Sequence, residues 1–223
     1  MLGNYIATEM KAKTLAIIDD RTAYGQGLAD VVEKVAKEKG VKVVAREFTN
    51  EKATDFNAIL TKIRAAKPDV VMFGGMDSVA GPMAKQMKQL GIKAALVGGD
   101  GACSPEYIKL AGDAANALTC SMAGEAVEKL AKGEDFKQRY KAKFNQEVQV
   151  YSPYSYDAVF VIADAIKRAG KADRAAVTAA MPATNYTGLT GTISFDDKGD
   201  IKNGAISMFK VKDGKLEYIS TSR

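Results

Sequence analysis

The sequence predicts an α/β protein in which a doubly wound parallel sheet is followed by helices that have no sheet of their own. Over the first 124 residues, short apolar runs rich in β-branched residues alternate with amphipathic helical stretches. The runs are apolar throughout, which suits central parallel strands covered by helices on both faces. Alternation at this spacing predicts right-handed crossovers between neighbouring strands. After Gly124 the strand signal stops and helical periodicity continues.

Five apolar runs are the expected strands of the parallel sheet. They cover residues 14–19, 41–48, 69–75, 94–100 and 117–124. Between them, apolar side chains recur three and four residues apart, as on one face of a helix. These helical stripes cover residues 28–36, 56–63 and 79–90, and Ser104 followed by Pro105 predicts the start of a fourth helix.

The second half of the chain changes character twice. Residues 125–182 predict successive helices, with start signals at Ser152-Pro153 and Asp173. Strand character returns after Gly188, and residues 206–211 and 215–219 flank Asp213-Gly214, a strong hairpin signal. Helices without a sheet must bury their apolar faces on something else.

Composition excludes several classes of function. The chain has 32 basic and 27 acidic residues, a net charge of +5, and the two signs are interleaved, so no nucleic-acid partner is expected. It has no histidine and two cysteines, which excludes Ser-His and Cys-His catalysis and leaves too few ligands for zinc or iron–sulfur sites. We therefore expect no cofactor, no metal and no enzymatic activity. There is no run long enough to span a membrane and no signal peptide, so we expect any export signal to have been removed or lost.

Polar and glycine-rich segments follow three of the expected strands. In an open parallel sheet, ligands bind beyond the carboxyl ends of the strands. Tyr24, Asp77 and Asp100 supply polar groups there, Met76 supplies apolar surface, and Gly101 lets backbone approach a ligand closely. Such a pocket suits a ligand with one cationic or donor end and one apolar end. The same glycines and aspartates could instead serve tight turns and helix caps, and the residues alone leave both readings open.

A partial dinucleotide fingerprint lies in the same region. Gly25 and Gly27 match its spacing and Glu47 follows twenty residues later, but Asp30 replaces the third glycine, where a small residue is needed. Cys103 falls at the end of the fourth expected strand region and Cys120 falls inside the fifth, which we expect to be its neighbour in the sheet. A disulfide between them would stabilise the fold by roughly 3 kcal/mol in an oxidising compartment, and two buried free thiols are the alternative.

Several ordered motifs carry a resemblance to a known family. They are residues 19–29, 73–77, 98–101, 151–158 and 191–200. Through them the chain closely resembles the periplasmic branched-chain amino-acid-binding proteins of ABC importers, over nearly its whole length. The resemblance implies the type I fold of two doubly wound lobes that close around an amino acid, a periplasmic location, and a membrane permease as partner.

The resemblance also implies roles for individual residues. Tyr24 matches an aromatic wall of the second lobe, and Asp100 matches the acidic position that holds the α-ammonium group of the ligand. Tyr151 matches an aromatic residue that faces the ligand side chain, and Met76 stands where some members have tyrosine. Residues 1–122 and 205–223 correspond to the second, C-terminal lobe.

Residues 123–204 correspond to a helical segment of the first lobe. The resemblance implies that this chain lacks most of that lobe. A truncated gene, a cleaved fragment and a stand-alone half that dimerises or swaps its helices are three accounts of this, and we expect the isolated chain to self-associate because exposed apolar helix faces favour association. A ligand-sensing regulatory domain of the same architecture and a dinucleotide-dependent enzyme are the alternative functions.

Overall fold

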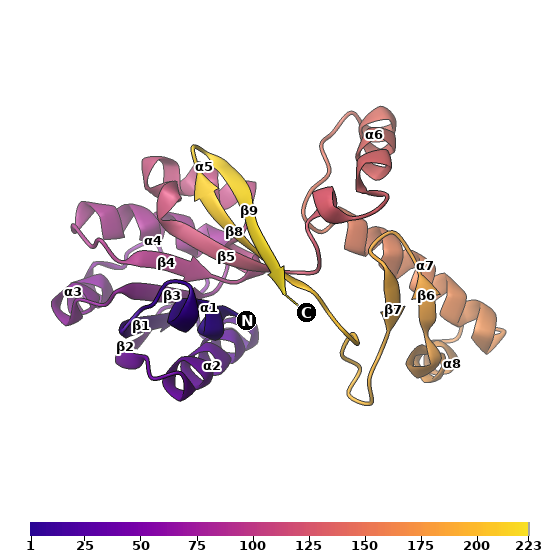
Figure 1. Ribbon diagram of the computed structural model, residues 1–223, viewed down its shortest axis with the longest axis horizontal. Helices are drawn as coiled ribbons and strands as arrows, with labels where there is room; N and C mark the ends of the chain where they lie inside the picture. The colour runs from indigo at the N-terminus through magenta and orange to yellow at the C-terminus, as the bar shows by residue number, and fades with distance from the viewer. Residues whose placement is uncertain (223) are drawn as a thin grey trace. The chain divides into compact units, whose positions relative to one another are not determined.

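The structure is a computed structural model that describes residues 1–222, and it divides into two compact units (Figure 1). The first comprises Met1–Met122 and Ser207–Ser222, and the second comprises Ala123–Ile206. The chain therefore passes from one unit to the other twice. At the return, residues 205 and 206 lie with the second unit, whereas the family resemblance placed them in the same lobe as residues 1–122.

A seven-stranded sheet forms the centre of the first unit, in the order β2-β1-β3-β4-β5-β8-β9. Its strands are β1 (Thr14–Asp19), β2 (Lys42–Phe48), β3 (Val70–Gly74), β4 (Ala95–Gly98), β5 (Leu118–Ala123), β8 (Ile206–Lys212) and β9 (Lys215–Ser222). The pairs that join β2, β1, β3, β4 and β5 are all parallel. The expected parallel sheet is confirmed, although some strands end earlier than the apolar runs do. The hairpin is also confirmed, with Asp213 and Gly214 both at positive φ.

Helices cover both faces of this sheet (Figure 1). They are α1 (Leu2–Thr8), α2 (Ala23–Glu38), α3 (Asn57–Ala66), α4 (Asp77–Gln89) and α5 (Pro105–Ala111), with the 3₁₀ turns η1 (Asp100–Ala102) and η2 (Gly112–Ala117). On one face, Ile6 of α1 and Val32 of α2 share a buried cluster with Leu15, Ile17 and Met72 of the strands. The alternate strand side chains are buried as well, so the sheet is an apolar layer between two helical layers.

Two helices differ from expectation. No helix was expected at residues 2–8, but α1 buries Leu2 and Ile6 against α2. It is too short for its apolar spacing to stand out in the sequence. Helix α2 begins at Ala23, before the expected apolar stripe at residues 28–36, because the Thr22 side chain caps it by accepting a hydrogen bond from Gly25 N.

The second unit is mainly helical. Its elements are η3 (Val127–Lys129), α6 (Gly133–Phe144), α7 (Ser152–Ala169), α8 (Arg174–Ala180), η4 (Met181–Ala183) and the antiparallel pair β6 (Asn185–Thr187) and β7 (Thr192–Ser194). The expected starts at Ser152 and Asp173 are confirmed: Pro153 lies in the first turn of α7, and Asp173 caps α8. Strand β6 was not predicted, because its three residues, of which two are exposed and one is half-buried, give no apolar run.

One buried carboxylate ties helix to loop in the second unit. Asp157 of α7 is 1% exposed. It accepts hydrogen bonds from Leu189 N at 2.9 Å and Thr190 N at 2.7 Å, and another from the Thr190 hydroxyl.

Among the helices of residues 1–222, none combines the length and apolarity needed to cross a membrane.

Candidate ligand-binding site

The ends of three parallel strands bring the predicted site residues of the first unit together. Tyr24 lies in the first turn of α2, just after β1. Met76 occupies the N-cap position of α4, just after β3. Asp100 and Gly101 form the η1 turn, just after β4. Because β1, β3 and β4 are adjacent and parallel, these segments share the carboxyl edge of the sheet.

The hydroxyl group of Tyr24 joins two of these segments. It donates a hydrogen bond to Asp100 Oδ1 at 2.9 Å and accepts one from Gly101 N at 3.1 Å. A phenol can donate and accept at once, so both capacities are used to hold the η1 turn. From the sequence, Tyr24 was expected to supply a polar group and, by the family resemblance, an aromatic wall. The contact of its hydroxyl with Asp100 is a finding of the structure.

An apolar surface lies beside this polar pair. A Cβ atom on Gly101 would lie 2.8 Å from Met76 Sδ and 3.1 Å from Tyr24 Cε1, so the three residues are in close contact. The Met76 side chain is 47% exposed and the Tyr24 side chain 37%. The edge thus presents a carboxylate next to a thioether and an aromatic ring, as a ligand with an ammonium end and an apolar end requires.

Asp77 connects two loops of the site. Its Oδ2 accepts a hydrogen bond from Ser104 Oγ at 2.5 Å, and its Oδ1 accepts one from Ser78 N at 2.7 Å. Ser104 also caps α5 by accepting a hydrogen bond from Tyr107 N. These contacts give Asp77 a role in joining α4 to α5, and direct contact with a ligand stays a prediction.

A disulfide joins Cys103 to Cys120, with the two Cα atoms 5.6 Å apart. Cys120 lies in β5, opposite Gly98 of β4, and Cys103 directly follows the η1 turn. The bond therefore anchors the far end of the turn that carries Asp100. Both cysteines are fully buried.

Tyr151 belongs to the second unit. It occupies the N-cap position of α7, and its side chain is 49% exposed. Its proposed contact with a ligand side chain stays a prediction.

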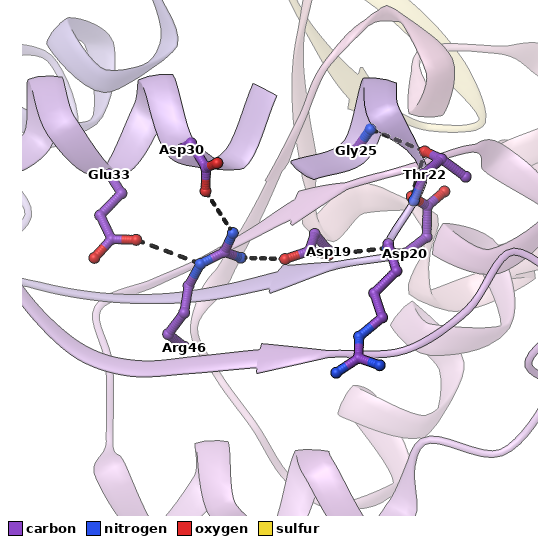
Figure 2. Close-up of polar contacts among 8 residues, drawn as sticks. Asp19, Asp20, Thr22, Gly25, Asp30, Glu33 and Arg46 are labelled. Carbon is purple, nitrogen blue, oxygen red and sulfur yellow. Dashed lines mark hydrogen bonds and ion pairs between the residues drawn. The ribbon is translucent and has the colours of Figure 1, made fainter. Parts of the chain in front are cut away.

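Two consecutive buried carboxylates lie under the start of α2 and face opposite ways (Figure 2). Asp19 Oδ2 lies 2.5 Å from Nη1 of Arg46 on β2, an ion pair rather than an aligned hydrogen bond. The same guanidinium contacts Asp30 Oδ1 at 2.9 Å and Glu33 Oε2 at 3.3 Å, both on α2. Arg46 therefore ties α2 to β1 and β2. It was not singled out in the sequence, where a lone arginine in a strand gives no signal.

The second carboxylate, Asp20, faces the helix start. Its Oδ1 accepts hydrogen bonds from Thr22 N at 3.0 Å and Thr22 Oγ1 at 2.6 Å. Thr22 Oγ1 in turn accepts a hydrogen bond from Gly25 N at 2.9 Å (Figure 2). The dinucleotide interpretation does not fit this arrangement, because a pyrophosphate at this helix start would meet the buried Asp20 carboxylate. Gly25 and Gly27 lie inside α2 instead.

A separate groove of about 410 Å³ lies at the end of β2. The Arg21 guanidinium stacks 3.3 Å from the centroid of the Phe48 ring, which forms one wall. Asp55, another lining residue, accepts hydrogen bonds from the backbone and side chain of Asn57, which lower the pKa of its carboxyl. By contrast, the carboxyl edge brings a carboxylate, a thioether and an aromatic ring together from three adjacent strand ends, so it is the better candidate site.

Comparison with known proteins identifies the family of this chain. The sequence profile described as "Periplasmic binding protein" matches residues 1–215. The chain belongs to the periplasmic binding protein family. Its members bind solutes and are not enzymes, so the dinucleotide-dependent enzyme is excluded.

Three relatives illustrate the family. The chain is 34% identical over 208 residues to the leucine-, isoleucine-, valine-, threonine- and alanine-binding protein of Pseudomonas aeruginosa, covering 93% of this chain and 56% of that protein. The leucine-binding protein LivK of Thermotoga maritima superposes with a TM-score of 0.90 at 26% identity, covering 99% of this chain and 63% of that one. The protein LivJ of Streptococcus pneumoniae, solved with isoleucine, gives 0.82 at 26% identity, covering 99% and 62%.

This periplasmic binding protein chain thus spans about three fifths of the length of its relatives. The match extends across both units, since it covers almost all of residues 1–222. The relatives are binding proteins for branched-chain amino acids, two of them named as leucine-binding.

Proposed function

We propose that this chain forms part of the amino-acid-binding site of the solute-binding component of an ABC importer. The ligand is a branched-chain or similar amphipathic amino acid. The observation that carries the proposal is the Asp100 carboxylate, held by the Tyr24 hydroxyl beside the apolar surface of Met76. A carboxylate in a partly desolvated position is a strong partner for an α-ammonium group. A thioether is a flexible partner for an aliphatic side chain.

The relatives support this choice of ligand. The Pseudomonas protein is named for five aliphatic or small amino acids, and the Streptococcus protein was solved with isoleucine. A membrane permease as partner and a periplasmic location follow from the same proposal. The Cys103–Cys120 disulfide is consistent with an oxidising compartment.

The proposal predicts that Asp100→Asn weakens amino-acid binding. The substitution keeps the shape of the side chain but removes its charge, and hydrogen bonds to charged groups contribute about 1.5–3 kcal/mol. We expect the dissociation constant for leucine, from calorimetric titration of this chain, to rise roughly 10- to 100-fold. Unchanged affinity in Asp100→Asn would refute the assignment.

The matched control is Asp113→Asn, in the same unit. The Asp113 side chain is 81% exposed and pairs with Lys88 at 2.7 Å. It lies in η2, on a different element from the site. This control should leave the affinity for leucine unchanged, which separates the loss of one carboxylate at the site from a general change of charge.

We further propose that the isolated chain self-associates through an apolar stripe on α7. The stripe is formed by Tyr156, Val159, Phe160 and Ile162, all of which are at least 40% exposed. Within it, the Tyr156 and Phe160 rings lie 4.9 Å apart in a tilted arrangement, and the Tyr156 ring meets the buried Phe136 ring of α6 edge-on at 5.4 Å. Contiguous exposed apolar surface of this kind favours association in water.

A further inference from the structure

We propose that Thr22, supported by Asp20, is a positioning residue that places the Tyr24 hydroxyl against Asp100. This inference rests on the proposed function, because it concerns the same candidate site. Neither residue was singled out as a site residue by the sequence. The structure assigns them this role through three connected contacts.

The first contact fixes Thr22 itself. Asp20 is 2% exposed, and its Oδ1 receives both the backbone N–H and the hydroxyl of Thr22, at 3.0 and 2.6 Å. A carboxylate that accepts two hydrogen bonds from one residue holds both its backbone and its side chain in one orientation.

The second contact fixes the start of α2. The Thr22 hydroxyl accepts a hydrogen bond from Gly25 N at 2.9 Å, which places the first helical turn directly after β1. Gly25 is itself seated on the sheet edge, because a Cβ atom there would clash with the Asp20 carboxylate and with the carbonyl oxygen of Gly74. The first turn therefore has little freedom to shift along the edge.

The third contact is the result of the first two. Tyr24 lies within this first turn, between the capping residue Thr22 and Gly25, which contacts the sheet edge. Its hydroxyl reaches Asp100 Oδ1 at 2.9 Å and Gly101 N at 3.1 Å across the edge. Hydrogen bonds are lost beyond about 3.5 Å, so a small shift of the helix start would break both contacts.

The direct test observes Tyr24 in this chain without any ligand. Tyrosine is replaced by 3-fluorotyrosine, and the Tyr24 fluorine signal is assigned by its loss in Tyr24→Phe. In Thr22→Val, which keeps the shape of the side chain but removes its hydroxyl, we expect this signal to shift and broaden. Thr22→Ser, which keeps the hydroxyl, should restore it.

The control is Asp173→Ala, which removes the analogous cap of α8 in the other unit, where Asp173 Oδ1 accepts from Ala176 N at 3.0 Å. It should lower stability comparably and leave the Tyr24 signal in place. An unchanged Tyr24 signal in Thr22→Val would show that Thr22 is merely a stabilising cap, and would overturn the inference.

Leucine titration adds an independent readout. Thr22→Val should weaken binding roughly fivefold, the equivalent of one ordinary hydrogen bond. In a Tyr24→Phe background the same substitution should have no further effect, because the hydroxyl on which it acts is gone. A full Thr22→Val effect in that background would also overturn the inference. If the parent chain binds no leucine, the proposed function fails, and the fluorine signal still decides the role of Thr22.

Discussion

Single side chains at the carboxyl edge of the sheet make contacts that their residue types alone do not predict. Tyr24 uses its hydroxyl as donor to Asp100 and as acceptor from Gly101 N, so its ring and its polar end serve different purposes. Asp19 and Asp20 are consecutive in sequence, yet one faces Arg46 and the other faces Thr22. Asp19 ends β1, and the backbone N–H of Asp20 continues the pairing by donating to the carbonyl oxygen of Gly74, so the two side chains point to opposite sides as along a strand.

In Tyr154 of the second unit, as in Tyr24, the hydroxyl and the ring make different contacts. Its hydroxyl donates a hydrogen bond to the carbonyl oxygen of Glu125 at 2.5 Å, and its ring fills the space next to Gly124. Burial, together with smaller effects of the nearby Glu125 and Asp157 carboxylates, raises the pKa of Tyr154 to about 12. The buried phenol is therefore stable only in its neutral form.

This environment predicts that Tyr154→Phe destabilises the chain by about 1 kcal/mol at neutral pH, the contribution of one hydrogen bond. The folded pKa lies above the ordinary tyrosine value near 10, so the stabilisation is fully present below pH 10 and is lost as the pH rises towards 12. Urea unfolding at pH 8 and pH 11 should show the gap between wild type and Tyr154→Phe shrinking at the higher pH.

Tyr186→Phe is the control for this prediction. Tyr186 lies in β6, and within residues 1–222 its hydroxyl makes no hydrogen bond, so the free energy of unfolding should not change. A gap for Tyr154→Phe that is equally large at both pH values would contradict the role of the neutral phenol.

At the scale of elements, strong local patterns predicted the structure well. The five parallel strands follow from their apolar runs. The hairpin follows from Asp213-Gly214, because an Asp-Gly pair readily adopts the two positive φ angles of a tight turn. The starts of α5, α7 and α8 follow from cap residues and from proline in the first turn. These signals are local, so the sequence carries them without knowledge of the fold.

What the sequence did not predict depends on distant contacts. Helix α1 exists because it packs on α2, and Arg46 matters because the fold brings it to Asp19, Asp30 and Glu33. Tyr24, Met76, Asp100 and Gly101 could be named as candidates from their positions after strands. That the Tyr24 hydroxyl contacts Asp100, and that Asp77 instead pairs with Ser104, became visible only in three dimensions.

The disulfide shows how two elements can be fixed relative to each other. Cys103 and Cys120 are 17 positions apart and join the end of η1 to β5. The Tyr24 hydroxyl holds the start of the same turn. The turn that carries Asp100 is thus anchored on both sides, which limits the reorganisation needed when a ligand binds.

At the scale of the whole molecule, the exposed stripe on α7 predicts self-association. Val159 is 64% exposed, and a lysine there would place a charge in the middle of the proposed contact. Sedimentation velocity should show associated species for the wild-type chain and a larger monomer fraction for Val159→Lys. Val31→Lys is the matched control, because Val31 is 61% exposed on α2. A wild-type chain that sediments as a monomer at all concentrations would contradict the proposal.

The most direct test of the central claim is an amide NMR titration of this chain with leucine. The account predicts saturable shifts concentrated at the carboxyl edge of the first unit, at Tyr24, Met76 and residues 99–101, which disappear in Asp100→Asn. It also predicts weaker shifts with an aliphatic carboxylic acid that lacks the amine, because Asp100 would then have no ammonium partner. Shifts confined to the groove at Phe48 and Asp55, or none at any leucine concentration, would contradict it.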